Sequence, residues 1–301
     1  MPSEKMLPLY IEGKNIKDVN GNLIHLRGVN KPSFEWNKKG ERMEEDQWAY
    51  AHNWGINVVR LPFKMEWMIE DENYRQRIDD AIALAEKYGM YIILDCHEYG
   101  FPDIPAWIDM WTMLAKRYLG RPSVLFDIFS EPHGISDEEW ISLAQTCVNA
   151  IRDVNPDVLI VISANGWGNA PIHWVQTAPI TGGNIIYSLH WYIASTPISK
   201  PYTLEKVKSW LINKGWKAIL DNNIAPVIVG EFGASYPRDP DELIWLEHFL
   251  TVMHEWGMHW TYWSWWETPK EGTGGMCGCV TPAWDGTPNM TGEVLIKFLK
   301  K

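Results

Sequence analysis

The stretch VLFDIFSE, residues 124–131, is a short apolar run that ends in a carboxylate. A second stretch, PVIVGEFG (226–233), has the same character and carries Glu231 near its end. A glutamate is almost never fully buried without a partner, so its place at the end of a strand-like run indicates a functional position. We therefore expect Glu131 and Glu231 to project into one shared site. Glycoside hydrolysis is a reaction that requires two such carboxyl groups.

Apolar runs of this kind alternate with amphipathic segments along the whole chain, a pattern typical of βα units around a parallel sheet. We predict eight strands, at residues 22–30, 57–63, 91–98, 124–131, 159–165, 185–192, 226–233 and 259–265. Eight strands, each followed by a helix, predict an α/β protein with a closed (β/α)8 TIM barrel. The alternative is a doubly wound open sheet, which would need about six strands and a Gly-rich phosphate turn after the first. Here RGVNKPSF (27–34) follows instead.

The ends of several elements are marked by residues with a known local role. Ser136 with Glu139 predicts a capping box, and glycines are expected to end the helices before three strands. These positions are Gly55, Gly89 and Gly257, while Asp239, Pro240 and Glu242 are expected to open a helix. The segment LYIEGKNIKDVNGN (9–22) predicts a short N-terminal hairpin that turns at Asn20-Gly21 and covers the closed end of the barrel. With no repeat or linker composition, we expect one catalytic domain over residues 1–301.

The composition excludes several classes of function. A net charge of -11 without a Lys/Arg cluster argues against a nucleic-acid surface, so the expected partner is neutral or cationic. No apolar run approaches membrane-spanning length, and no signal-like segment opens the chain. We expect a soluble monomer without a cofactor, which is the mature part of a secreted protein or, alternatively, cytoplasmic.

The four cysteines do not form a disulfide framework. Cys96 and Cys147 fall in apolar stretches and are predicted to be buried thiols. Cys277 and Cys279 form a C-x-C in a glycine-rich loop, where free thiols and a strained bridge both remain open. A metal site would need further ligands at short spacing, and none follows, so no metal is expected.

Polar side chains gather where the predicted strands end, the place at which a barrel of this type carries its active site. They are Arg60, His97, Glu131, His190, Tyr192, Glu231 and Trp263. Each has an ordinary structural role available when taken singly. Together they supply an acid, a nucleophile, charge partners and a stacking ring at equivalent positions, which favours a catalytic site.

In these motifs the sequence resembles glycoside hydrolase family 5, the cellulase-like barrels, over nearly the whole chain. The motifs, in order, are GKNIKDVNGNLIHLRGVN (13–30), VVRLPF (58–63), LDCHEYG (94–100), SEPHG (130–134), LHWY (189–192), VGEFG (229–233), and YWSWW (262–266) with GTGG (272–275). Each is weak alone, but their order and spacing are specific.

The resemblance implies a role for each of these residues. Glu131 would be the acid/base and Glu231 the nucleophile, which Arg60 and Tyr192 would hydrogen-bond and hold ionised. Glu131, without such a partner and walled by aromatic groups, would keep its proton longer. His97 and His190 would line the sugar ring, and Trp263 would form its stacking floor.

The sequence departs from the family pattern at Ser130, where the usual residue is asparagine. The asparagine amide reaches the sugar 2-hydroxyl and helps to arrange the nucleophile, and serine is shorter. Three interpretations are open: a weakened enzyme, an altered subsite in which a water bridges the gap, or a substituted laboratory variant.

Nineteen tryptophans are several times the ordinary number for a chain of this length. Four lie in helical patterns and are predicted to be core: Trp48, Trp54, Trp111 and Trp245. Seven others are expected in loops beyond strand ends: Trp36, Trp107, Trp167, Trp191, Trp265, Trp266 and Trp284. We expect about three of these to stack on substrate sugars. The substrate-binding candidates are Trp36, Trp167, Trp191, Trp263, Trp265 and Trp266.

These features predict a retaining endo-β-glycosidase that acts on β-1,4-glucan, with β-mannanase or another β-glycanase activity as the alternative on the same barrel. A hypothesis from another class is a carbohydrate-binding barrel that has lost turnover, with Ser130 as the first visible loss. A phosphate-handling isomerase is suggested only by GTGG, near which Lys270 is the one basic residue.

Overall fold

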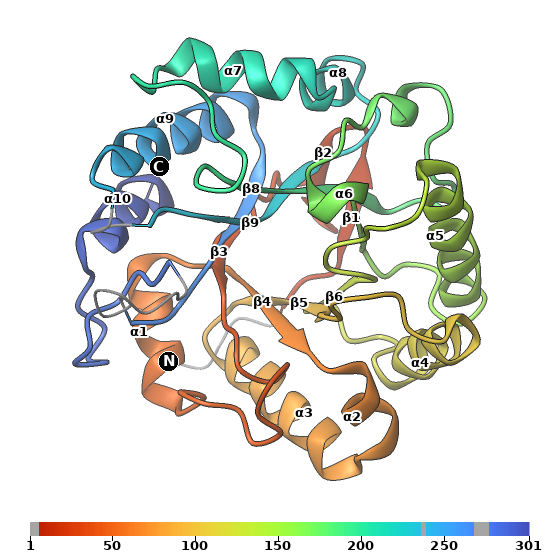
Figure 1. The fold of residues 1–301 in the computed structure, drawn as a ribbon. Coiled ribbons are helices and arrows are strands. Elements are labelled where there is room, and N and C mark those ends of the chain that lie inside the picture. Colours follow the sequence, from red (N-terminus) through yellow and green to blue (C-terminus); the bar gives the residue numbers. More distant parts are fainter. Residues whose placement is uncertain (1–5, 236–238, 268–276, 301) are drawn as a thin grey trace.

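Eight parallel strands close into a barrel in the computed structural model, which describes residues 6–235, 239–267 and 277–300 (Figure 1). The strands follow one another around the barrel in chain order, and β10 pairs with β3 to close it. Their bounds are β3 Arg27–Asn30, β4 Val58–Phe63, β5 Tyr91–Cys96, β6 Val124–Asp127, β7 Ile160–Ser163, β8 Ile185–Tyr192, β9 Val227–Gly233 and β10 His259–Tyr262. The predicted (β/α)8 barrel is confirmed.

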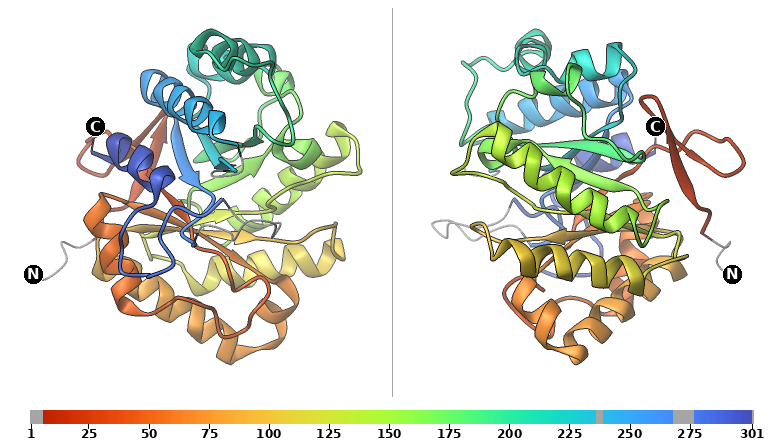
Figure 2. Two further views of the ribbon diagram at one scale, coloured as in Figure 1. Left: turned by 60° about the vertical axis from the view of Figure 1, so that its left-hand side comes forward. Right: turned by 90° about the vertical axis from the view of Figure 1, so that its right-hand side faces the viewer.

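Helices form a ring around the barrel, as Figure 1 shows along the barrel axis and Figure 2 from the side. They are α1 Glu45–Trp54, α2 Met65–Glu70, α3 Glu72–Lys87, α4 Ile104–Arg117, α5 Asp137–Arg152, α6 Asn165–Gly168, α7 Leu204–Asn213, α8 Trp216–Asp221, α9 Asp241–Trp256 and α10 Met290–Leu299, with a 3-10 turn η1 at His173–Gln176. Within the described ranges, none of these helices has the length and apolar character needed to span a bilayer.

The predicted element ends are largely confirmed. Ser136 and Glu139 form a reciprocal capping box at the start of α5. Gly55 and Gly257 end α1 and α9 in the left-handed conformation, which costs glycine little because it has no Cβ. The two strands that differ most are shorter than predicted: β3 begins at Arg27 instead of residue 22, and β6 ends at Asp127, which leaves Glu131 in the loop that follows.

The N-terminal hairpin turns at a different place from the one predicted. Strands β1 (Leu9–Glu12) and β2 (Asn15–Asp18) pair around Gly13-Lys14, where Gly13 has a left-handed φ of 59°. Asn20-Gly21 makes a second turn instead, after which Leu23 bridges back to Lys17. Leu9 and Ile16 pack with Val58 and other residues from the first halves of the barrel strands, so the hairpin covers the closed end as expected (Figure 2).

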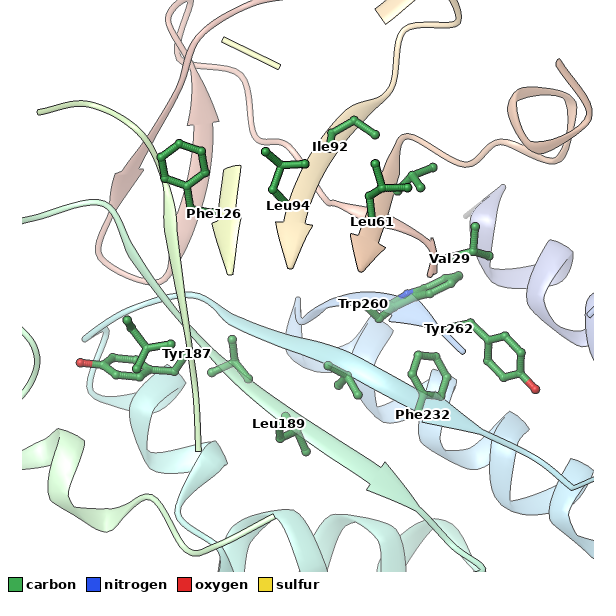
Figure 3. Packing of buried hydrophobic residues seen from close by; sticks show 14 of the residues in the cluster. Val29, Leu61, Ile92, Leu94, Phe126, Tyr187, Leu189, Phe232, Trp260 and Tyr262 are labelled. Carbon is green, nitrogen blue, oxygen red and sulfur yellow. The ribbon is translucent and has the colours of Figure 1, made fainter. Parts of the chain in front are cut away.

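Side chains alternate between the two faces of each barrel strand, as the pleat requires. The outward set packs under the helices and forms the main hydrophobic core, part of which is shown in Figure 3. The inward set begins with an apolar layer near the closed end, which includes Val58, Ile93 and Ile228. Two residues further along the strands, the inward positions become polar and charged. This change of character at the carboxyl ends of the strands positions the site.

Candidate active site

Arg60 is the centre of a buried ionic network inside the barrel. It lies on β4 two residues after Val58, so it faces inward, and it is fully buried. Its Nε donates to Asp127 Oδ2 at 2.9 Å, and its Nη2 lies 2.9 Å from Asp95 Oδ1. Its Nη1 donates to Glu231 Oε1 at 2.7 Å and to Asn30 Oδ1 at 2.9 Å. Burial would lower the pKa of Arg60, but these carboxylates raise it above its ordinary value, so the side chain stays charged.

Glu231 is brought into this network by an irregularity in the sheet. His190 of β8 pairs with Glu231 directly after Leu189 pairs with Val229, so Gly230 is left as the extra residue of a bulge. Such a bulge re-aims the side chain that follows it. A Cβ at position 230 would lie only 2.6 Å from Ser188 Oγ and 2.8 Å from His190 Nε2, so this close approach requires glycine.

The carboxylate of Glu231 is held in its ionised form. Arg60 donates to one oxygen, and the Tyr192 hydroxyl donates to the other at 2.8 Å, as predicted. Burial alone would raise the pKa of Glu231. The positive charges of His190, Arg60 and His97, with the Tyr192 hydrogen bond, outweigh burial and lower this pKa to about 2. The group therefore has the protonation state that a nucleophile needs.

His97 follows β5 and adds a second cation beside Glu231. Its Nδ1 lies 2.7 Å from Asp95 Oδ2 and 3.9 Å from Glu231 Oε1. Burial lowers the pKa of His97, but Asp95 and then Glu231 raise it further, to about 9. The His97 ring stacks on Trp263 with a centroid distance of 5.5 Å and an angle of 16°.

Glu131 has a partner, contrary to the prediction that it lacks one. The Nδ1 of His190 lies 2.8 Å from Glu131 Oε1 and 3.8 Å from Glu231 Oε2, so this ring stands between the two glutamates. Burial lowers the pKa of His190, but the charges of Glu231 and Glu131 raise it above its ordinary value. The sequence could not show this contact, because the bulge that aligns His190 with Glu231 depends on how β8 and β9 pair.

The two glutamates lie in one cleft. A carboxylate oxygen of Glu131, one of Glu231 and a ring nitrogen of His190 all lie within 4.8 Å of one another. The cleft has a volume of about 690 Å³. Its walls include His97, Tyr99, Trp167, His190, Tyr192 and Trp263. The aromatic wall expected around Glu131 is therefore present.

Ser130 lies under the cleft, within the ionic network. Its hydroxyl accepts from Arg60 Nη2 at 2.9 Å and lies 3.5 Å from Glu231 Oε1, and the residue is buried. The serine thus contacts both the nucleophile candidate and the arginine that holds it.

The tryptophan candidates separate into two groups. The predicted core set, Trp48, Trp54, Trp111 and Trp245, is buried as expected. For four of the tryptophans expected in loops the prediction is wrong, because their side chains are buried: Trp107, Trp191, Trp265 and Trp284. Trp191 alternates with inward-facing His190 on β8, so it points outward and stacks on Trp210 at 3.9 Å under the helices. Trp107 lies within α4 and donates to Ile128 O.

Three of the seven loop candidates keep an accessible ring. Trp36 and Trp167 are 40% and 50% exposed, and Trp266 is half-buried with its ring 5.9 Å from that of Trp36. Of these three, Trp167 lines the same cleft as Glu131. The tryptophans that remain candidates for stacking on substrate sugars are therefore these three residues and Trp263.

Asp95 and Asp127 belong to the ionic network of the site, and the sequence interpretation missed them. They pair with each other in register across β5 and β6, and both are fully buried against Arg60. Each interrupts an apolar strand, which is the same signal that identified Glu131 and Glu231. Burial raises the pKa of Asp127 to about 7, and Arg60 opposes this shift.

Within the part of the chain that the structure describes, two sets of residues have the composition of a metal site. Asp95, His97 and Glu231 form one, and Glu131, His190 and Glu231 form the other. Both share Glu231, whose two oxygens already accept from Arg60 and Tyr192. The geometry therefore favours an ion-pair network over metal coordination.

The cysteines are free thiols, and no bridge joins Cys277 to Cys279. Cys96 and Cys147 are buried, as predicted. The GTGG motif and Lys270, on which the isomerase hypothesis depended, lie outside the described residues.

Comparison with known proteins gives one family. A family model described as Cellulase (glycosyl hydrolase family 5) matches residues 16–269. Endoglucanase E-5 of Thermobifida fusca is 24% identical over 305 residues, which cover 95% of this chain and 62% of the relative. An endoglucanase of Paenibacillus polymyxa is 27% identical over 329 residues, which cover 89% of this chain and 81% of the relative. The chain thus spans less than two thirds of the length of the first relative.

Solved structures share the fold. The beta-glucanase SdGluc5_26A of Saccharophagus degradans has a TM-score of 0.85 and 22% identity, with 99% of this chain and 94% of that chain covered. That protein has also been solved in complex with cellotetraose.

Proposed function

The chain belongs to glycosyl hydrolase family 5, and from this premise we propose that it is a retaining endo-β-1,4-glucanase. The proposal names Glu231 as the nucleophile and Glu131 as the acid/base. Its substrate is an internal β-1,4 linkage of a glucan, in keeping with the names of the endoglucanase relatives and with a neutral polymer as partner for an acidic chain.

In the first step a Glu231 oxygen attacks the anomeric carbon, and the bond from this carbon to the glycosidic oxygen breaks. Glu131 gives its proton to the departing oxygen, which leaves as the free hydroxyl of the shortened chain. The sugar is then joined to Glu231 as an ester. In the second step Glu131 removes a proton from water, the water oxygen attacks the same carbon, and Glu231 departs as a carboxylate. Two inversions give net retention.

The observation that carries this proposal is the short separation of the two glutamates. Retaining enzymes have carboxyl groups about 5–5.5 Å apart, whereas inverting enzymes leave about 6.5–9.5 Å for a water. Oxygens of Glu131 and Glu231 lie within 4.8 Å of each other, which supports direct attack.

The electrostatics support the same division of roles. Glu231 is kept ionised by Arg60 and Tyr192, so it is ready to attack. Glu131 is more exposed than Glu231, and its carboxylate oxygen lies against the ring of His190 instead of an arginine.

A panel of polysaccharides tests the proposal. We expect the purified protein to release reducing ends from carboxymethylcellulose faster than from mannan, xylan or mixed-linkage glucan. Proton NMR of the first products of cellohexaose should show the β-anomer before mutarotation. First products in the α-form would contradict retention, and faster hydrolysis of mannan would favour the mannanase alternative. Negligible rates on all four polymers would favour the carbohydrate-binding alternative.

Replacing Ser130 by asparagine is expected to increase kcat/KM on β-glucan by about fivefold, an amount that one additional hydrogen bond can supply. The longer amide should reach the sugar 2-hydroxyl, a contact that strengthens in the transition state. Ser130→Ala is the matched control and should lower kcat/KM, because Arg60 loses an acceptor. An unchanged or lower value for Ser130→Asn would mean that the serine is adapted to its own substrate.

We also propose that the enzyme acts outside the cell, since its polymeric substrate cannot enter one. Assay of culture medium against cell lysate of the native source would test this, and activity confined to the lysate would contradict it.

A further inference from the structure

His133 makes two contacts that connect the acid/base to the wall of the cleft. It lies two residues after Glu131, and its Nδ1 is 2.7 Å from the backbone oxygen of Glu131. Because a carbonyl oxygen only accepts, this nitrogen carries the hydrogen. The His133 ring also stacks on the Trp167 ring with a centroid distance of 3.4 Å and an angle of 11°.

Trp167 is displayed in a conformation that needs support. It has φ 61° and ψ 40°, between two left-handed glycines, and a tryptophan in this region is strained. Half of its surface is exposed on the cleft that Glu131 lines. A large exposed ring held in a strained backbone is typical of a residue kept for binding.

The loops that carry Glu131 and Trp167 are joined along their length. The Trp167 N–H donates to Pro132 O at 3.1 Å, and Asn165 Nδ2 donates to Ile135 O at 2.8 Å. These bonds hold the two loops together, and the His133 ring adds a link of its own, because it contacts both the Glu131 carbonyl and the Trp167 ring.

We propose that His133 is a positioning residue that aligns the acid/base Glu131 with a leaving-group platform formed by Trp167. This inference rests on the proposed function. Glu131 protonates the oxygen that departs with the leaving sugar, so a ring on the Glu131 side of the cleft faces that sugar. His133 sets the distance between the proton donor and the sugar that receives the proton.

Two substrates separate this role from a general effect on folding. Cellohexaose has a poor leaving group, which needs both a proton and a sugar-binding platform. The 2,4-dinitrophenyl β-cellobioside has a leaving group that departs with little protonation and carries no leaving sugar. Because kcat/KM reports on the steps through the first bond cleavage, only the cellohexaose value should depend on His133.

We expect His133→Ala to lower kcat/KM on cellohexaose by about tenfold and to change it by less than about twofold on the dinitrophenyl substrate. His133→Phe keeps a ring against Trp167 but loses the hydrogen bond, so kcat/KM on cellohexaose should fall by a smaller factor, about threefold. In a double-mutant cycle, the variant that carries both Trp167→Ala and His133→Ala should show a smaller fold-decrease in kcat/KM on cellohexaose than the product of the two single decreases, because the residues act together.

The matched control is His173→Ala. His173 is also bonded to a backbone carbonyl, with its Nε2 3.1 Å from Asn213 O, but it is not among the residues that line the cleft. It should leave both kcat/KM values unchanged.

Three results would overturn the inference: no change on either substrate in His133→Ala, an equal loss on both, or fully multiplicative losses in the cycle. Thermal unfolding of each variant shows whether it folds, and His133→Phe replaces the alanine variant if that one does not. A wild type that is inactive on both substrates would instead count against the proposed function.

Discussion

Glu231→Gln is expected to lower kcat on cellohexaose by at least about 10⁴-fold, the scale seen when an enzyme loses its nucleophile. The amide has the size of the carboxylate but cannot attack the anomeric carbon, and it presents Arg60 with a neutral group. Initial rates of reducing-end release give the measurement. Glu86→Gln is the matched control, since this glutamate is also bonded to an arginine, Arg121, but at the far end of the barrel. Residual activity of Glu231→Gln within tenfold of wild type would contradict the assignment.

Azide rescue extends this test to both glutamates with the dinitrophenyl substrate. In Glu231→Ala, azide can enter the space of the lost nucleophile and should give the α-glycosyl azide. In Glu131→Ala, azide should attack the glycosyl-enzyme ester and give the β-glycosyl azide. The opposite pair of products would exchange the two roles.

Arg60→Met is expected to lower the free energy of unfolding by about 3–5 kcal/mol, the usual result of breaking a buried ion pair from one side. The methionine fills similar space but leaves Asp95, Asp127 and Glu231 without the cation that all three contact. Urea denaturation followed by tryptophan fluorescence measures the change. The matched control is Arg121→Met, which removes a partly exposed ion pair with Glu86. This variant should lower the free energy of unfolding by no more than about 1 kcal/mol. Similar decreases in the free energy of unfolding in the two variants would show that the buried network contributes no more to stability than a partly exposed ion pair.

The cost of Arg60→Met should depend on pH in a definite direction. Burial already raises the pKa of Asp127 to about 7, and loss of the opposing arginine raises it further. A folded-state pKa above the unfolded value means that the folded protein binds more protons, so its relative stability increases as pH falls. The destabilisation should therefore be smaller at pH 5 than at pH 8. A larger loss at pH 5 would contradict this account.

The barrel could be predicted from the sequence because each strand carries its own signal. The runs at 185–192 and 226–233 are apolar, short and flanked by turn or helix-ending residues, and these are properties of neighbours in the chain. The capping box at Ser136 and the glycine at position 257 are local in the same sense. The turn of the hairpin could not be predicted in this way, because both Gly13-Lys14 and Asn20-Gly21 turn, and only pairing shows which turn joins β1 to β2.

The positions of the candidate catalytic residues were also indicated locally, since a charged group within an apolar run is rarely tolerated unless it serves a site or an ion pair. Asp95 and Asp127 carry the same signal, and it would have identified them as partners of a buried cation. Strand alternation alone would have placed Trp191 on the outer face, opposite to His190. Trp265 could not be placed in this way, because it follows the end of β10 and is buried against Gln47 from α1.

The sequence by itself determined the number and order of strands and the residue types at their carboxyl ends. It did so because periodicity and capping depend on residues close together in the chain. Only the tertiary structure decided which of these groups meet: His190 with Glu131, Arg60 with three carboxylates, and His133 with Trp167. Those contacts join segments that are far apart along the chain, up to the 171 residues between Arg60 and Glu231. They depend on how the strands assemble into the barrel and, for the alignment of His190 with Glu231, on the bulge at Gly230.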